Sequence, residues 1–380
     1  MRIQKIELKN WRNFRSADVE IEADVIYLVG PNASGKSNFL DALRFLRDIA
    51  KPIGGGLQTA LNERGGFSKV RCLHARGAGK KKGMTNLEIA VTLSDDCDDW
   101  RYELAINFPQ SSKKRPLVVR EIVTKNGKPI CERPRGDEQD DDEQLAVTFL
   151  EQAAQNRNFR ALSNYFAAIT YIHLVPQLVK FGERIGGHLL PEDPFGQAFM
   201  KRIADAPKST RNARLKKISN TLQGIVPGLD DLHFHTDSEG RPHIEMRYLT
   251  HRVHTSRQLE DQLSDGTLRL IALLWLLQEN HSAPLLLEEP ELSLNEEIVR
   301  QLHRLFHKIG KRDNQVFVTT HSYALLSNKG IPSSSIFTII PGAEGSRIEP
   351  PSEPERIAIQ NGIPPGDVVL ASGEQFALDI

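Results

Sequence analysis

The sequence predicts an α/β fold, because buried strands, a glycine-rich turn and amphipathic helices follow one another along the chain. The apolar run Val25–Val29 is typical of a buried strand, and a glycine-rich turn over 30–35 leads from it into a helix with one apolar face. Two further apolar runs, 285–287 and 315–320, also end in polar residues. Alternating segments between these runs add an antiparallel layer to the expected fold.

The turn after Val29 has the spacing of a phosphate-binding loop, G-x-x-x-x-G-K-S. This motif needs a strand before it and a helix after it, and both are expected here. Backbone N–H groups of such a turn point at phosphate oxygens, and the start of the helix adds a field that favours anions. We therefore expect a nucleoside triphosphate at this turn, with Lys36 on the outer phosphates and the Ser37 hydroxyl on Mg²⁺.

An acidic pair follows the apolar run 285–287. Of these two carboxylates, Glu288 and Glu289, one can hold Mg²⁺ through water while the next polarises an attacking water molecule as a general base. A strand that merely ends in surface glutamates is the alternative, and this segment by itself leaves it open.

His321 and Ser322 come directly after the run 315–320. Ligand sites in open α/β sheets lie at the carboxyl ends of strands, so His321 stands where a side chain could sense the terminal phosphate. A solvated or structural histidine is the alternative.

A third polar segment starts the apolar helix expected near Leu270–Leu277. Ser264 suits the N-cap of this helix, and Gly266 keeps its first turn open to close backbone approach. An ordinary helix cap is the alternative interpretation of these two residues.

The remaining elements follow from periodicity. Alternation predicts strands at Leu87–Leu93 and Tyr102–Phe108, and hairpins over 118–131 and 232–249, with a further strand at Ile336–Ile340. Helices are expected at Leu145–Gln155, Phe159–Ala168, Phe195–Ala204 and Ala213–Leu222. This pattern divides the chain into an N-terminal lobe (1–143), a helical insertion (144–226) and a C-terminal lobe (227–380).

Taken in order, the motifs resemble those of ABC-type ATPases. The opening Lys5–Phe14 looks like the start of RecF, SMC and related overcoming-lysogenisation-defect ATPases. The sequence GPNASGKSN, then LSDGTLR, LLLEEPELSLN and VTTHS, is similar to the stand-alone ATPases of that branch, many of them encoded in prokaryotic anti-phage defence systems. The resemblance covers roughly residues 1–60 and 255–330 well.

The resemblance implies an ABC-ATPase-like P-loop head with an antiparallel β lobe and a compact helical insertion, and ATP and Mg²⁺ as its cofactors. Glu288 takes the Walker B position, where aspartate is usual, Glu289 is the catalytic glutamate, His321 the switch histidine, and 293–295 the D-loop. Gln177 stands where the Q-loop glutamine belongs, and with Ser37 and Glu288 it would contact the metal. The nucleotide-binding set would be Gly30, Pro31, Asn32, Ala33, Ser34, Gly35, Lys36, Ser37, Asn38, Ser264 and Gly266.

The resemblance also implies partners. The signature helix of one protomer faces ATP held by another, so we expect an ATP-dependent homodimer or higher oligomer. The tail after Pro354 is too short for the TOPRIM nuclease that related proteins carry, so a separate effector, such as a TOPRIM or HNH nuclease, is expected. The alternative is a RecF-like DNA-repair clamp that binds DNA directly. A transporter subunit is disfavoured by the opening segment and by the large insertion.

Composition limits the other possibilities. The 49 Lys and Arg residues equal the 49 Asp and Glu residues, so no global field draws the chain to DNA or membrane. Three cysteines without C-x-x-C spacing, no signal peptide and no long apolar run indicate a cytoplasmic protein with no membrane contact. Nucleic acid remains a possible partner through basic clusters at 80–82, at 113–115 and, the best candidate, at 208–217, although solvated faces are the alternative.

Overall fold

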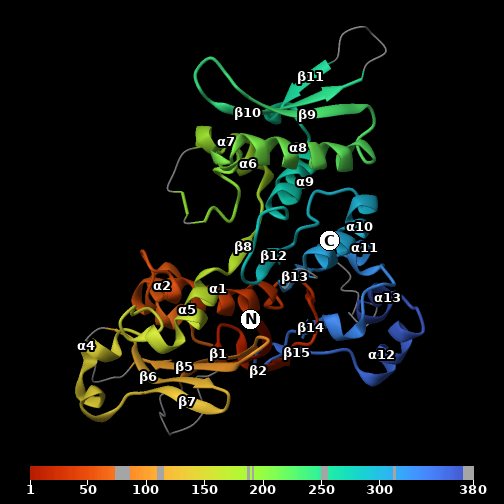
Figure 1. The fold of residues 1–380 in the computed structure, drawn as a ribbon. Helices are drawn as coiled ribbons and strands as arrows, with labels where there is room; N and C mark the ends of the chain where they lie inside the picture. Colours follow the sequence, from red (N-terminus) through yellow and green to blue (C-terminus); the bar gives the residue numbers. More distant parts are fainter. Residues whose placement is uncertain are drawn as a thin grey trace. The chain divides into compact units, whose positions relative to one another are not determined.

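The computed structural model describes residues 1–72, 86–108, 115–185, 189–190, 192–249, 256–310 and 314–370 (Figure 1). Contacts divide the chain into unit 1 (Met1–Thr170, His281–Leu286, Leu305–Ile380) and unit 2 (Tyr171–Asn280, Leu287–Arg304), and each unit is described by itself. The predicted three-part division along the sequence stays a prediction. The basic residues Lys80–Lys82, Lys113 and Lys114 lie outside the described residues.

Unit 1 contains the predicted antiparallel layer. Its apolar side chains alternate, as in the strand Leu87–Ser94, where every second residue is buried. Alternation with period two buries one face of a sheet and leaves the other to solvent. The sheet has six strands in the order β2 (Phe14–Glu20), β1 (Arg2–Trp11), β4 (Leu87–Ser94), β5 (Asp99–Asn107), β6 (Leu117–Lys125) and β7 (Lys128–Arg133).

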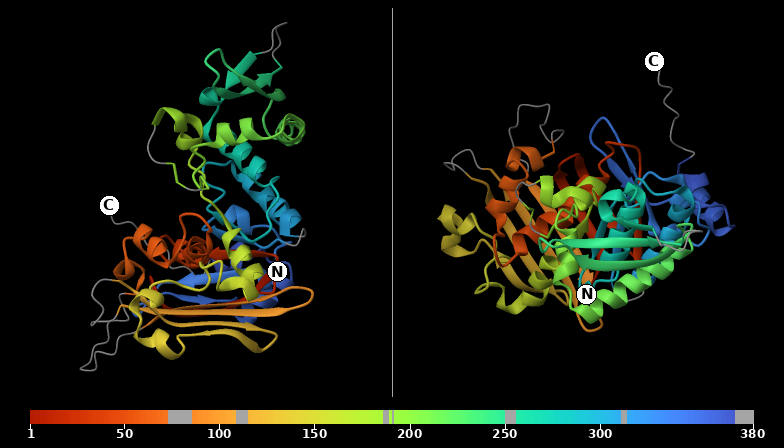
Figure 2. Two further views of the ribbon diagram at one scale, coloured as in Figure 1. Left: turned by 60° about the vertical axis from the view of Figure 1, so that its left-hand side comes forward. Right: turned by 90° about the horizontal axis from the view of Figure 1, so that it is seen from above.

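Helices cover the buried face of this sheet, as Figures 1 and 2 show. Aromatic pairs fix their positions: Trp11 on β1 meets Phe45 with ring centroids 5.2 Å apart, and Tyr102 on β5 meets Phe166 at 5.7 Å. Such pairs contribute beyond the area that they bury. The helices of this part are α1 (Lys36–Ala50), α2 (Leu57–Glu63), α3 (Phe67–Val70), α4 (Asp142–Leu145) and α5 (Arg160–Ala167).

The second six-stranded sheet is built around β3 (Val25–Val29), whose five residues are all buried. Parallel neighbours explain this continuous apolar run, because both faces of such a strand are covered. β3 pairs in parallel with β13 and β14. The strand order is β15 (Arg347–Glu349), β14 (Ile336–Ile340), β3, β13 (Val316–Thr320), β12 (Leu285–Glu288) and β8 (Thr170–Ile172). Short helices α11 (Tyr323–Leu326), α12 (Glu353–Gln360) and α13 (Pro365–Val369) complete unit 1.

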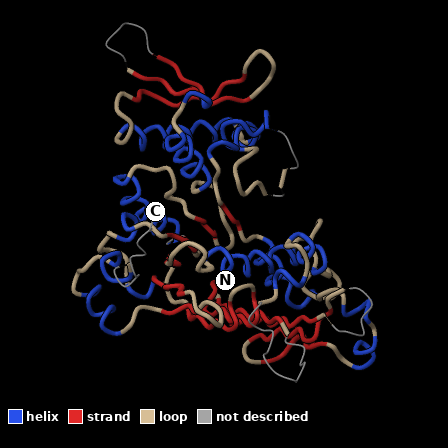
Figure 3. Tube along the Cα trace, turned by 180° about the vertical axis from the view of Figure 1, so that it is seen from behind, coloured by secondary structure: helices blue, strands red, loops and turns tan. Residues whose placement is uncertain are grey.

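Unit 2 combines helices with a three-stranded antiparallel sheet, which lies along α8 in Figures 1 and 3. Its strands, in the order β11 (Ser256–Leu259), β10 (Pro242–Tyr248) and β9 (Leu229–Thr236), confirm the predicted hairpin over 232–249 and add β11 to it. The helices are α6 (Pro176–Ile185), α7 (Phe199–Asp205), α8 (Lys208–Gln223) and α9 (Asp265–Leu276), while α10 (Glu296–Gly310) starts here and ends in unit 1. Nowhere in the described ranges is a helix both long and apolar enough to cross a membrane.

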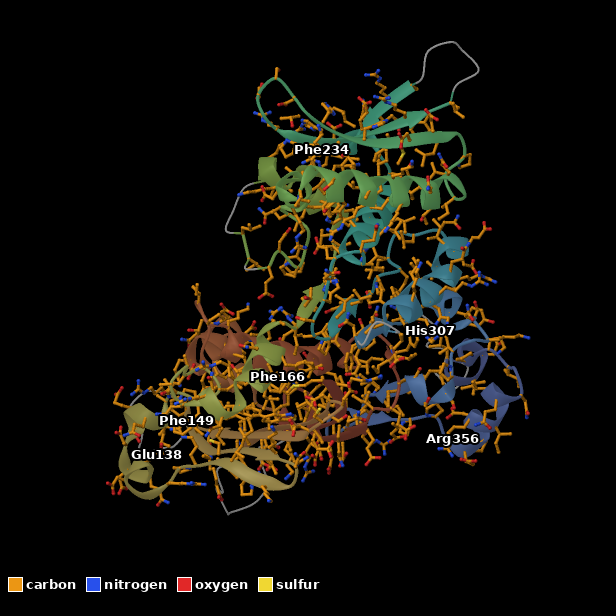
Figure 4. All side chains as sticks on the ribbon, in the orientation of Figure 1. Glu138, Phe149, Phe166, Phe234, His307 and Arg356 are labelled. Atoms are coloured by element: carbon orange, nitrogen blue, oxygen red, sulfur yellow. The ribbon has the colours of Figure 1, made fainter. Side chains whose placement is uncertain are left out.

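The helix predicted over Leu145–Gln155 is wrong. Only the short α4, which ends at Leu145, is helical there, and turns follow it. The carboxylate of Glu121, fully buried under this segment, accepts hydrogen bonds from the backbone N–H groups of Phe149 (2.7 Å) and Leu150 (3.1 Å). Side chains that bond the backbone compete with helical hydrogen bonds, so Glu121 fixes the turn instead. Phe149 is labelled in Figure 4.

Candidate nucleotide site

The glycine-rich loop of unit 1 has the backbone of a phosphate cradle. The loop leaves β3 after Val29, and Ala33 (φ 62°) and Gly35 (φ 111°) take left-handed conformations before α1 begins at Lys36. No side chain caps the start of α1. The first N–H groups of an uncapped helix need external acceptors, and an anion supplies them.

Side chains inside the loop fit an anionic ligand as well. Lys36 is 6% exposed, and its Nζ donates hydrogen bonds to the carbonyl oxygens of Gly30 (2.8 Å) and Pro31 (3.0 Å). The Ser34 hydroxyl is fully buried and has no hydrogen-bond partner among the described residues. A buried polar atom without a partner is costly, so it marks a place where a ligand can bind. Ser37 is exposed at the first turn of α1.

Asn13, in the turn between β1 and β2, braces this loop. Its Nδ2 donates to the backbone oxygen of Ser34 (2.8 Å) and to the Ser346 hydroxyl (2.7 Å), and its Oδ1 accepts from Asn38 (2.8 Å). The Ser346 hydroxyl donates to the same Ser34 oxygen (2.6 Å). A Cβ on Gly35 would lie 2.1 Å from the Asn13 amide nitrogen, so only glycine fits there.

We expect Asn13→Ala to weaken nucleotide binding by loosening this loop. The change removes hydrogen bonds worth about 1 kcal/mol each, and a loss of 1–2 kcal/mol corresponds to a roughly 5–30-fold higher KM for ATP. Steady-state ATPase kinetics of the wild type and the variant measure this change in KM. The matched control is Asn126→Ala, which removes an asparagine that bonds Asp99 and Asp98 in a distant turn of the same unit. If both variants lose the same thermal stability and neither changes KM, Asn13 does not position the loop.

The register of β3 and β13 brings His321 to the loop. Thr320 pairs with Val29 in this parallel ladder, so the next residues, His321 and Gly30, leave the sheet side by side at the carboxyl ends of their strands. Ser322 caps α11 by accepting from the Leu325 N–H (3.3 Å), which fixes the chain directly after the histidine. This register places His321 at the end of the strand next to the loop, and its role as phosphate sensor stays a prediction.

Buried ion pairs hold α1 behind the loop. Arg64 donates to Asp41 (2.9 Å) and Asp48 (2.8 Å), and Arg12 donates to Asp41 (2.7 Å). Burial by itself raises the pKa of both carboxyls, but the neighbouring guanidinium groups outweigh it. The pKa of Asp41 is lowered, chiefly by Arg64, and that of Asp48 is lowered to about 2 by Arg47 and Arg64. Both acids therefore stay charged at neutral pH and tie α1 to the segments around it.

Unit 2 carries the acidic pair. Glu288 ends β12, and its Oε2 accepts a hydrogen bond from the Tyr171 hydroxyl at 2.5 Å. Glu289 turns out of the strand with a left-handed backbone (φ 42°), and its carbonyl oxygen accepts from Arg269 (2.9 Å). Burial lowers the pKa of Arg269, which is 3% exposed. Arg269 on α9 thus fixes the backbone of Glu289, the proposed general base.

The segment before α9 also meets the acidic loop inside unit 2. Ser264 is the N-cap of α9 and accepts from the Thr267 N–H (3.2 Å), which confirms the predicted cap. A Cβ on Gly266 would lie 2.3 Å from the Ser293 carbonyl oxygen, so a glycine is required for this approach. Ser293 itself has φ 63°. Ser264, Gly266, Glu289 and Ser293 therefore form one constrained cluster.

Gln177 lies in the first turn of α6. Its Nε2 donates to Asp265 Oδ2 at 2.9 Å, which places it beside Ser264 within unit 2. The sequence had suggested a contact with metal for this side chain, and that role stays a prediction.

The sequence patterns did not single out four side chains that contact the candidate site residues, namely Asn13, Ser346, Tyr171 and Arg269. Tyr171 and Arg269 lie 117 and 20 residues from the acids that they bond. Arg269 carried a signal, because an arginine inside an apolar helix needs a buried acceptor. Asn13 carried none beyond its place in the opening motif.

Comparison with known families shows to which family the chain belongs. Residues 25–327 match the family described as "AAA domain, putative AbiEii toxin, Type IV TA system", and residues 3–46 match the "P-loop containing region of AAA domain". The chain belongs to this AAA family. The first match contains the phosphate loop, the signature segment, the acidic pair and His321.

Curated relatives of this AAA chain are similar to it over short stretches. The DNA replication and repair protein RecF of Chlamydia caviae is 46% identical over 46 residues, 12% of this chain and 12% of that protein. The chromosome partition protein Smc of Halothermothrix orenii is 31% identical over 132 residues, 34% of this chain and 10% of that protein. The chain thus spans about a tenth of the length of these relatives. The predicted membership of an ABC-type ATPase branch with RecF and SMC is confirmed.

A solved structure confirms the fold class. The SMC head bound to the C-terminal winged-helix domain of ScpA superposes with a TM-score of 0.53 over 94% of this chain and 99% of that chain, at 16% identity. At this identity the likeness concerns the fold alone. The AAA chain therefore has the SMC-head, ABC-ATPase-like architecture, a mixed α/β fold with antiparallel sheets and helical elements.

Proposed function

We propose that this AAA chain binds and hydrolyses ATP as a sandwich dimer and is the sensor or motor subunit of a prokaryotic anti-phage defence complex. The observation that carries ATP binding is the loop at the end of β3, with its buried Ser34 hydroxyl, its enclosed Lys36 and His321 at the neighbouring strand end. Family membership supports the same activity.

Each residue has a distinct task in this proposal. The loop Gly30–Ser37 holds the phosphates through backbone N–H groups and Lys36, and Asn38 follows it. Ser37 and Glu288, with Gln177 as a further candidate, hold Mg²⁺, which neutralises charge on the phosphates. Glu289 accepts a proton from the attacking water, because a carboxylate beside the reacting phosphate can act as general base. His321 contacts the terminal phosphate.

The second protomer supplies Ser264 and Gly266 to the ATP that the first one holds. The N-terminus of α9 offers N–H groups and a favourable field for phosphate oxygens. Within each protomer, the hydrogen bond from Arg269 on α9 to the Glu289 carbonyl oxygen would couple nucleotide contact at Ser264 to the position of the catalytic acid.

An effector in a separate chain, a TOPRIM or HNH nuclease, would act under control of the ATP state. The family description names a putative toxin of a toxin–antitoxin system, and the sequence resembles stand-alone defence ATPases. The acidic runs outside the Glu288–Glu289 pair, Asp95–Asp99 and Arg135–Glu143, have a spacing that suits solvation better than a two-metal site.

We expect the purified chain to hydrolyse ATP and to leave plasmid DNA and tRNA intact with Mg²⁺ or Mn²⁺. When it is coexpressed with the product of a neighbouring nuclease gene, the complex should cleave nucleic acid in a manner that depends on the bound nucleotide. Gel assays over a time course measure both. Cleavage by the single chain that is lost on mutation of its own residues would show that the effector is not separate.

A RecF-like clamp that binds DNA directly is the second candidate, favoured by the 46-residue match to RecF. It predicts ATP-dependent binding of duplex DNA by the chain alone. Filter binding without any partner protein distinguishes it from the defence complex.

A further inference from the structure

A polar groove in unit 2 has no place in the proposed ATP cycle. It lies between α8 and β9 and has a volume of about 750 Å³. Pockets that hold small ligands and cofactors span roughly 300–1,000 Å³. Figure 4 labels Phe234, which lies on the sheet beside α8. The lining side chains that carry the argument below are Lys208, Arg211, Lys216, Ser219, Asp230 and Asp231.

The basic side chains of α8 have different surroundings: some pack inside unit 2 and others line the groove. The helix has five lysines and arginines and no acid. Arg214 packs inside unit 2. Its guanidinium carbon lies 5.2 Å from the centroid of the Trp275 ring, and its Nη1 lies 3.8 Å from a carboxylate oxygen of Glu279. Lys208 and Lys216 line the groove, are exposed, and form no ion pair within the described ranges. The helix therefore does not present one continuous cationic face, and two of its exposed lysines, Lys208 and Lys216, lie at the groove.

Arg211 gives the groove a planar cationic surface. Its guanidinium stacks on Phe234 at 4.0 Å from the ring centroid, and Nη1 donates to the Ala204 carbonyl oxygen (2.9 Å). Its Nε is buried and has no partner among the described residues. Arginine planes held in this way are surfaces on which nucleobases stack.

Ser219 is the second sign of a ligand. It lines the groove, is 1% exposed, and its hydroxyl has no hydrogen-bond partner in the part of the chain that the structure describes. A buried hydroxyl normally finds a partner, because leaving it without one costs about 1–3 kcal/mol. A polar ligand in the groove would supply the missing bond.

The opposite wall, formed by the sheet, carries two acids beside His233 and Arg247. Asp230 and Asp231 line it, and Asp231 pairs with His233 (2.9 Å). Carboxylates repel a phosphodiester backbone that runs along the whole groove, but they bind ribose hydroxyls and amino groups well. The lining thus suits a ligand with an anionic end, a planar middle and hydrogen-bond donors.

We propose that the groove between α8 and β9 is a second nucleotide site, separate from the loop at 30–37. Lys208 and Lys216 receive the phosphate, the Arg211 guanidinium stacks on the base, and Ser219 and Asp230 bond the sugar or base edge. The shared chemistry is one nucleotide unit, either free or at the end of a short single strand.

Binding is measured in the Lys36→Ala background, which removes the first site, with ATP, GTP and a tetranucleotide as probes in calorimetric titrations. Lys216→Ala should weaken binding at least tenfold, whereas its exposed neighbour Lys217→Ala, which does not line the groove, should leave Kd unchanged. Ser219→Ala should weaken binding several-fold without lowering the melting temperature, because its hydroxyl has no partner to lose. Tighter binding of ATP or GTP would indicate a free nucleotide as the ligand, and tighter binding of the tetranucleotide would indicate the end of a short single strand.

Three results would overturn the proposal. The first is no binding of any probe at about 1 mM, a concentration that detects even weak sites. The second is an equal loss with Lys217→Ala, which would indicate a general electrostatic surface. The third is equal or tighter binding of a poly-glutamate peptide, which would indicate an acidic protein partner. None of these bears on ATP hydrolysis by the wild-type chain, so failure here is distinct from failure of the proposed function.

Discussion

Glu289→Gln is expected to abolish ATP hydrolysis while ATP still binds. General-base catalysis contributes about 10²–10⁴-fold, and an amide cannot accept the proton from water. The substitution keeps the size of the side chain. It also leaves the Arg269 bond intact, because this bond goes to the backbone oxygen of residue 289. The loop geometry should survive, so the loss should appear in kcat and leave nucleotide affinity near the wild-type value.

Phosphate release and equilibrium binding, measured on the same preparation, test this expectation. Lys36→Ala is the comparison variant, because it removes the charge that neutralises the outer phosphates and should lose binding itself. Hydrolysis by Glu289→Gln at the wild-type rate would mean that the base has been assigned wrongly, and Glu288 or Glu291 would be examined next.

A mixture of two inactive variants is expected to regain activity. Ser264→Arg blocks the signature face and Lys36→Ala blocks the phosphate loop, so each homodimer has no working site. Random pairing makes half of the dimers mixed, and each mixed dimer keeps one complete site out of two. The mixture should therefore hydrolyse ATP at about a quarter of the wild-type rate if an isologous dimer forms the site.

The control replaces another serine that starts a helix. Ser352 is the N-cap of α12 in unit 1, outside the signature segment, so Ser352→Arg should leave hydrolysis unchanged. A mixture that stays inactive, together with a wild-type rate per protomer that does not change with concentration, would contradict the sandwich arrangement.

Local patterns predicted the nucleotide loop and its surroundings well. The strand at Val25–Val29, the helix after Gly35 and the Ser264 cap each depend on residues a few positions apart, which short-range sequence signals describe. The position of His321 at a strand end beside the loop could be expected because the ends of parallel strands share one sheet edge.

What the sequence did not predict depends on distant partners. Glu121 overrides the helix expected at Leu145–Gln155 through backbone bonds that span 28 and 29 residues. Asn13 meets Ser346 across 333 residues. In the sequence, Arg214 belongs to the basic cluster at 208–217 that was a candidate for nucleic-acid binding. In the structure, its contacts with Trp275 and Glu279 make it part of the packing. No spacing along α8 reveals that difference.

The brace at Asn13 also has a consequence for biosynthesis. The nucleotide loop is translated early, but two of its supports, the Ser346 hydroxyl and the β14 carbonyl of Ile339 that closes over Gly30, are translated more than 300 residues later. Domains fold as they leave the ribosome, N-terminal parts first. A nascent chain therefore carries this loop without these supports until Ile339 and Ser346 have been added. We infer that the loop gains its full affinity for nucleotide only when β14 and the segment with Ser346 have folded against it.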